Sequence, residues 1–123
     1  MITGTVNPFH EAVVRLLLRA ASGQQQEIEA VLDTGFSGSL TLPPHMIETL
    51  GLPFRSRGGA ILADGSEATF DIYAAVVVWD GLPRPVLVEA ADTDPLLGMA
   101  LLHGHDLHIQ VVDGGHVTVK RLP

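Results

Sequence analysis

The sequence predicts a mainly β protein that folds as one domain over residues 1–123. Turn-forming pairs recur at short intervals along the chain, and runs rich in Val, Ile, Leu and Thr lie between them. The length suits a single core, and 46% of the residues are apolar, which leaves some apolar area for a partner surface. These observations together indicate an all-β barrel or sandwich.

Two hairpins are expected from the turn signals. The pair Asp64-Gly65 separates the run 58–63 from the run 66–79, and such a pair favours a tight hairpin turn. A second hairpin is expected to turn at Asp113 to Gly115, between the runs 107–112 and 116–122.

The run Glu11–Ala21 favours neither a helix nor a strand. Its Ala, Leu and Arg residues favour a helix, but its apolar residues follow neither period cleanly, so helix and strand both stay open. Two short helices are expected elsewhere. One covers 43–51, with proline at its start and Gly51 at its end, and the other covers 99–105 and follows Gly98.

Charge and composition exclude several classes of partner. The net charge of -7 and the absence of any Lys or Arg cluster argue against nucleic acid and anionic membranes. The apolar run Ala12–Ala21 is too short to span a bilayer and contains two arginines, so no membrane segment is expected. The chain has no cysteine, which excludes a thiol nucleophile and fits the reducing cytoplasm, the location that we expect. No cofactor is expected.

The tripeptide Asp33-Thr34-Gly35 stands at the end of an apolar run. A charged carboxylate beside a buried strand is costly unless something compensates it, so the position needs an explanation. One explanation is structural, because Asp-Thr-Gly readily forms an Asx turn after a strand. The other is catalytic, and the tripeptide alone does not separate the two.

The surrounding motifs favour the catalytic interpretation. Asp33-Thr34-Gly35 is followed by a hairpin over Ile61–Phe70 and then by Leu96-Leu97-Gly98, which leads into a short helix and a last strand. This ordered set resembles the retropepsin-like (clan AA) single-domain aspartic proteases, and especially their bacterial members. The resemblance covers most of the chain and implies a closed, β-barrel-like half-enzyme with a flap hairpin.

The resemblance also implies roles for individual residues. Asp33 would be the catalytic carboxylate, supported by Thr34 and Gly35. The substrate would contact Phe36 and the flap, and Leu97 and Gly98 would support the site from below. The flap residues expected to bind substrate are Ile61, Leu62, Ala63, Asp64 and Gly65. No metal ligand is implied.

The mechanism of this family needs two carboxylates that share one proton. The segment Asp92-Thr93-Asp94 is rejected as the second motif, because Asp94 stands where glycine is needed and no apolar strand is expected to lead into it. The second Asp33 must therefore come from another copy, which implies a homodimer acting on a peptide or protein substrate. We expect the C-terminal strand Val117–Leu122 in its interface, since no element is expected to cover it.

The chain departs from the retroviral members of the family at three positions. Those members usually carry Ala or Ser after the motif, a further Asp, and an Arg just after the downstream glycine. Here the positions hold Phe36, Ser37 and Met99, so both ends of the usual ion pair are missing together. A buried ion pair can be exchanged for apolar contacts without loss, but the strength of the dimer is left open.

Two rival interpretations belong to other classes. His103, His105 and His108 lie close together with Asp106 and suggest a metal site, although their spacing favours surface histidines over a closed site. The chain could also be a catalytically inert dimerisation or peptide-binding module of the same fold. The intact motif at Asp33 argues against an inert module.

Overall fold

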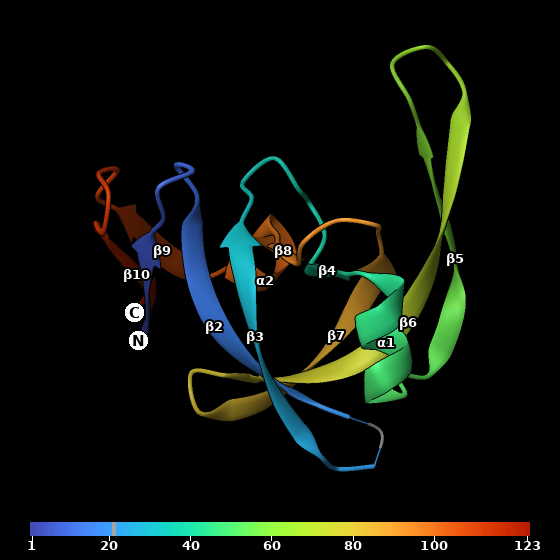
Figure 1. Ribbon diagram of the computed structural model, residues 1–123, viewed down its shortest axis with the longest axis horizontal. Helices are drawn as coiled ribbons and strands as arrows, with labels where there is room; N and C mark the ends of the chain where they lie inside the picture. The colour runs from blue at the N-terminus through green and yellow to red at the C-terminus, as the bar shows by residue number, and fades with distance from the viewer. Residues whose placement is uncertain (21) are drawn as a thin grey trace.

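The computed structural model describes residues 1–20 and 22–123 (Figure 1). This part of the chain contains ten strands and two short helices, so the mainly β prediction is confirmed. The helices are α1 (Pro44–Leu50) and α2 (Met99–Leu102). The strands are β1 (Ile2–Val6), β2 (Ala12–Arg19), β3 (Gln25–Leu32), β4 (Leu40–Leu42), β5 (Phe54–Ile61), β6 (Glu67–Trp79), β7 (Leu82–Ala90), β8 (Leu96–Leu97), β9 (His105–Ile109) and β10 (His116–Arg121).

All the described strands belong to one sheet, in the order β5-β6-β7-β4-β8-β3-β2-β1-β10-β9. An additional pairing of β6 with β2 joins the six strands from β6 to β2 into a ring. The ring is not a true barrel, because β8 pairs with β3 and with β4 over only two residues each. The sheet keeps two free edges, at β5 and β9.

The strand β2 resolves the segment that the sequence left open between helix and strand. Val14, Leu16 and Leu18 are buried, whereas Arg15 and Arg19 are exposed, which is the alternation of a strand with one face on the core. Pairing with β1, β3 and β6 outweighs the helical preference of Ala, Leu and Arg. Ala21, the last residue of that segment, lies outside the described residues.

The predicted hairpin turns and the helix over 43–51 are confirmed, whereas the helix predicted over 99–105 is shorter, because it ends at Leu102 and His105 already belongs to β9. Helix α1 ends at Gly51, whose φ of 61° places it in the left-handed region that glycine tolerates. Helix α2 follows Gly98, and hairpins turn at Asp64-Gly65 and at Asp113 to Gly115. Among the described residues, neither helix is long and apolar enough to cross a bilayer.

The C-terminal strand corrects one expectation. Strand β10 is hydrogen-bonded to β1 on one side and to β9 on the other, with Val119 opposite Ile2 and also opposite Leu107. The expectation that no element covers this strand is therefore wrong, because the N-terminal strand of the same chain covers it. A partner cannot extend the sheet at β10 without displacing a neighbour.

Candidate active site

Asp33 is the first residue after β3, and both its backbone and its side chain are held. Its N–H donates a 2.9 Å hydrogen bond to the carbonyl of Leu97, which extends the parallel pairing of β3 with β8 by one residue. The N–H of Gly35 donates a 2.9 Å hydrogen bond to Oδ1 of Asp33, and the N–H of Phe36 donates to its carbonyl. The Asx turn is thus present, and it fixes the direction of a half-buried carboxylate.

Gly98 lies directly beneath this turn and leaves no room for a side chain. A Cβ atom at Gly98 would stand 2.2 Å from the carbonyl oxygen of Gly38 and 2.5 Å from the ring of Phe36. The half-buried Phe36 ring also covers Gly38, where a Cβ would lie 2.5 Å from it. The two glycines therefore let the loop after Asp33 pack onto the start of α2.

Backbone hydrogen bonds tie this loop to α2. The N–H groups of Met99 and Ala100 donate to the carbonyls of Phe36 and Gly38 at 2.8 and 3.1 Å, so the first turn of the helix does not leave these donors unpaired. Gly98 donates in turn to the carbonyl of Ser39 at 2.9 Å. Met99, which replaces the usual arginine, is 47% exposed beside the loop.

Two buried residues support the site from below. Leu97 is fully buried and pairs with Leu32 and with Leu40, so it lies between the strands on either side of the Asp33 loop. Thr41 is buried as well, and its Oγ1 accepts a 3.0 Å hydrogen bond from the N–H of Leu96. This bond adds a side-chain link between β4 and β8, which pair over only two residues.

Thr34 lies at the tip of the turn and is exposed. It lines a cavity of about 230 Å³ together with Leu32, His10 and Val111, which come from β3, the β1–β2 loop and the β9–β10 loop. Three segments that are distant in sequence therefore meet beside the Asp33 turn. Val111 is 70% exposed, and the lining of the cavity is mainly apolar, with His10 and Glu11 as its titratable members.

The hairpin that the sequence analysis expected to be a flap is a long exposed ribbon formed by β5 and β6 (Figure 1). Its tip is closed by hydrogen bonds of 2.8 Å from the N–H of Leu62 to the carbonyl of Ser66 and of 2.9 Å from Gly65 to Leu62. Ser66 donates through its N–H and its hydroxyl to Asp64, and these bonds lower the pKa of the Asp64 carboxyl. Gly65 has a φ of 84°, which explains the glycine at the tip.

The expected substrate residues on the flap are all exposed. Ile61 is 78% exposed and Leu62 is 49% exposed, and Ala63, Asp64 and Gly65 are also exposed. The tip projects away from the body of the chain at the upper right of Figure 1, and the Asp33 loop lies on the same upper side. The structure therefore brings Asp33 to Phe36 together with Leu97 and Gly98, and it does not bring the flap tip into contact with them.

Glu89 was not singled out from the sequence, although it borders the Asp33 loop. It lies on β7 opposite Thr41 of β4, and its Oε2 would lie 3.3 Å from a Cβ at Gly38. Partial burial against this loop raises the pKa of the Glu89 carboxyl. Sequence patterns could not have identified it, because a single Glu in a predicted strand belongs to no motif.

The segment Asp92-Thr93-Asp94 forms a bend between β7 and β8. Strand β7 ends at Ala90, so the expectation that no apolar strand leads into this segment is wrong. Asp94 still stands in the place of the glycine, and it lines a cavity with Glu29 and Pro95 instead of facing the Asp33 carboxylate within the chain.

The histidines do not form a metal site in the described part of the chain. His103 and His108 are exposed, and β9 directs His105 and His108 to opposite faces because they are three residues apart in a strand. His105 instead accepts a 3.0 Å hydrogen bond from the indole N–H of Trp79.

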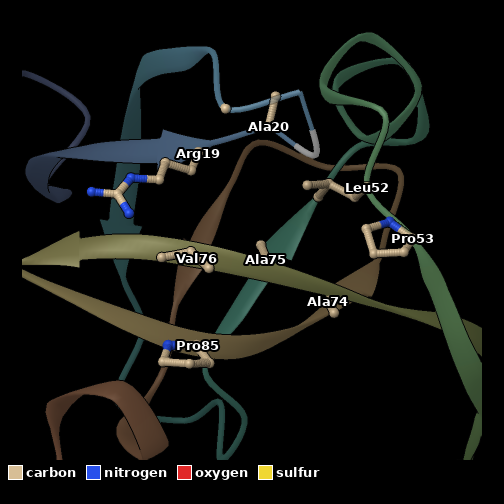
Figure 2. Close-up of a pocket in the computed structure, with 9 residues that line it drawn as sticks. Arg19, Ala20, Leu52, Pro53, Ala74, Ala75, Val76 and Pro85 are labelled. Carbon is tan, nitrogen blue, oxygen red and sulfur yellow. The ribbon is translucent and has the colours of Figure 1, made fainter.

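A larger cavity, of about 480 Å³, lies away from Asp33 (Figure 2). It is bordered by the end of β2, the connection from α1 to β5, and the middle of β6, with Ala20, Leu52 and Val76 among its walls. Arg19 is the only charged group among the described residues that line it. This apolar hollow therefore contains no acid or base for catalysis.

No family model and no curated protein matches the chain. Among solved structures, the chain is similar to the crystal structure of a retropepsin-like aspartic protease from Rickettsia conorii, with a TM-score of 0.61 and 16% sequence identity. The alignment covers 97% of this chain and 88% of that chain.

The fold is retropepsin-like. In this retropepsin-like fold the turn after β3, the glycine after β8 and the hairpin of β5 and β6 carry the motifs that the sequence predicted. At 16% identity the likeness concerns the fold, and the chemistry has to be argued from the residues themselves. The one oriented carboxylate of the turn, Asp33, is the residue from which that argument starts.

Proposed function

We propose that the chain is an aspartic endopeptidase that works as a homodimer, with one Asp33 from each subunit. The observation that carries the proposal is the Asp33 carboxylate, held by the Gly35 N–H in a turn that packs onto Gly98 and α2. The turn requires glycine at positions 38 and 98, and it keeps the carboxylate of Asp33 half-buried. Its position at the end of β3 in a retropepsin-like fold supports a catalytic function for this acid.

The chemistry needs a pair of carboxylates around one water molecule. In such a dyad the ionised carboxylate takes a proton from water as the water attacks the amide carbonyl, and the protonated partner donates to the developing oxyanion. Two like charges at close range do not both ionise, so the pair titrates as a unit and activity follows a bell on the acidic side of neutrality. One chain holds one Asp33, and the dyad requires a second copy.

We infer that the dimer face is the surface around Thr34. Val111 is 70% exposed, and Phe9 and Val112, the chain neighbours of His10 and Val111, are 81% and 64% exposed in the single chain. Val111 shares a cavity with Thr34, so this face borders the turn that must approach its twin across a twofold axis. Apolar side chains on this face can replace the missing ion pair between the usual Asp and Arg.

The substrate in this proposal is a peptide in extended form. An exposed two-stranded flap above a carboxylate dyad suits main-chain hydrogen bonding to an extended segment, with Ile61, Leu62 and Phe36 as apolar contacts. The cytoplasm stays the expected location, because the chain has no cysteine.

The test is a mixing experiment with Asp33→Asn. Asparagine keeps the size and much of the hydrogen bonding of the side chain but cannot act as a base, so the variant should fold, dimerise and lack peptidase activity. When equal amounts of the two chains exchange freely, random pairing leaves about a quarter of the dimers with two aspartates. Peptidase activity per total protein should then fall to about a quarter of its starting value.

The same mixture can contradict the proposal. Activity of about half would mean that each subunit works alone, since half of the subunits keep their carboxylate. Subunit exchange has to be confirmed by mixing two fluorescent labels. A dimeric chain that cleaves no peptide library between pH 3 and pH 8 would instead be the inert module.

A further inference from the structure

A further cavity lies where the β6–β7 turn meets the start of β9 and the end of β10. It has a volume of about 440 Å³, and its lining combines the apolar residues Trp79, Leu82 and Pro83 with Arg84, Arg121 and the segment from His103 to His105. In Figure 1 the β6–β7 turn is at the lower left, whereas the Asp33 loop is at the top. The cavity is therefore separate from the proposed active site.

The charge of this cavity is opposite to that of the chain. The protein has seven Lys and Arg against fourteen Asp and Glu, yet two arginines border this one cavity and none of its described lining residues is acidic. Arg84 donates from Nη1 and Nη2 to the carbonyls of Leu101 and Ala100, at 3.0 and 3.2 Å. These bonds fix the guanidinium at the end of α2 but do not neutralise its charge.

Arg121 keeps its charge available as well. The ion pairs formed among the described residues do not include it. Asp80 is the carboxylate that senses Arg121, but its pKa is lowered first by a hydrogen bond from the ammonium group of Met1. Asp80 and that ammonium group cancel, so the two arginines leave a net positive cavity.

His105 orients the indole ring of Trp79, which belongs to the apolar part of the cavity lining. The indole N–H of Trp79 donates to Nε2 of His105, so the remaining ring proton is on Nδ1, which donates a 3.0 Å hydrogen bond to the carbonyl of His103. The two rings meet edge to face at 81°. Trp79 is thus held with its polar atom satisfied, and Leu82 beside it is 57% exposed.

We propose that this cavity binds an organic carboxylate whose remaining part is apolar. The carboxylate would lie between Arg84 and Arg121, since guanidinium groups match a carboxylate in shape and charge. The apolar part would lie against Trp79, Leu82 and Pro83. The volume is within the range of small-molecule sites, and a doubly charged phosphate would have to lose more water beside this apolar wall.

The test uses the fluorescence of Trp79, which is the only tryptophan in the chain. With 4-phenylbutyrate as the probe, we expect a saturable change in fluorescence that gives a Kd of about 1 mM. The affinity should decrease as salt is added. The uncharged 4-phenylbutanol and the purely polar acetate should each bind at least about tenfold more weakly. Equal affinity for the alcohol, or for inorganic phosphate, would overturn the proposal.

Two variants test whether binding depends on the positive charge of the cavity. Arg121→Gln should raise the Kd of 4-phenylbutyrate at least about tenfold, and the matched control Arg15→Gln should leave it unchanged, because Arg15 lies on β2 near Glu27 and Glu29. Leu82→Asp should abolish binding by placing a negative charge in the cavity. An unchanged Kd in either cavity variant, with the native circular dichroism spectrum retained, would overturn the proposal.

Discussion

At the scale of single residues, Glu89 is a carboxylate that borders the Asp33 loop without belonging to any motif. Its side chain lies against Gly38, and partial burial raises its pKa. A raised pKa means that the folded chain holds the proton more tightly than the unfolded chain does. The ionised group therefore costs stability above the pKa of the folded state, and this cost disappears below the unfolded value, near pH 4.5.

Glu89→Gln removes that charge and should raise the free energy of unfolding at pH 7 by a few tenths of a kcal/mol, on the order of the effect of a surface substitution. The gain should vanish at pH 4, where the carboxyl of the unchanged protein is protonated and resembles the amide. Urea unfolding at the two pH values measures it, with Glu67→Gln as the control on an exposed part of β6. An equal gain at both pH values would contradict the electrostatic cause.

The sequence predicted some of these residues and could not predict others. Asp33 and Gly98 belong to ordered motifs, and the structure does hold them together through Leu97 and the loop. Glu89 and Arg84 have no motif, because their neighbours become apparent only when β7 lies beside β4 and α2. Pairings between distant strands determine such contacts, and local patterns in the chain contain no record of them.

At the scale of elements, the proposed flap has a turn whose geometry requires glycine at one position, Gly65. Gly65 has a φ of 84°, a conformation that a β-branched residue resists, whereas Gly59 in the same hairpin has ordinary backbone and no close neighbour. Gly65→Val should lower peptidase turnover and speed amide exchange at Leu62, whose N–H closes the turn. Gly59→Val is the matched control and should keep the slow exchange at Leu62.

Two outcomes of that experiment would count against the proposed flap. Unchanged turnover in Gly65→Val would mean that a segment other than this hairpin tip closes over the substrate. Unchanged exchange at Leu62 would mean that the strands of β5 and β6 hold the tip without help from the turn.

The secondary-structure elements differ in whether local sequence patterns can predict them. The hairpin turns and both short helices could be predicted from glycine, proline and aspartate, whose effects act over a few residues. The choice of a strand for β2 could not, because it depends on pairing with β1, β3 and β6. The two free edges of the sheet, at β5 and β9, follow from the same long-range order.

At the scale of the whole molecule, the proposed dimer can be tested through its apolar face. Val112→Glu places a charge on a side chain that is 64% exposed and should shift the sedimentation of the protein toward the monomer and reduce peptidase activity in parallel. Dilution of the unchanged protein should give the same pair of losses. An active monomer in either experiment would contradict a shared dyad.

The control for this variant also tests the interface first expected from the sequence. Leu122→Glu changes a residue of similar exposure, 53%, just after β10. Because β1 and β9 already cover β10, we expect this variant to remain dimeric. Dissociation by Leu122→Glu and not by Val112→Glu would return the interface to the C-terminal strand.

The pairing of β1 with β10 also has a consequence for synthesis on the ribosome. Ile2 is translated more than a hundred residues before its partner Val119. Until then β1 has only β2 as a neighbour, and its other edge is open to unrelated chains. Closure over such a long loop is slow, so the nascent protein should depend most on chaperones just before β10 emerges.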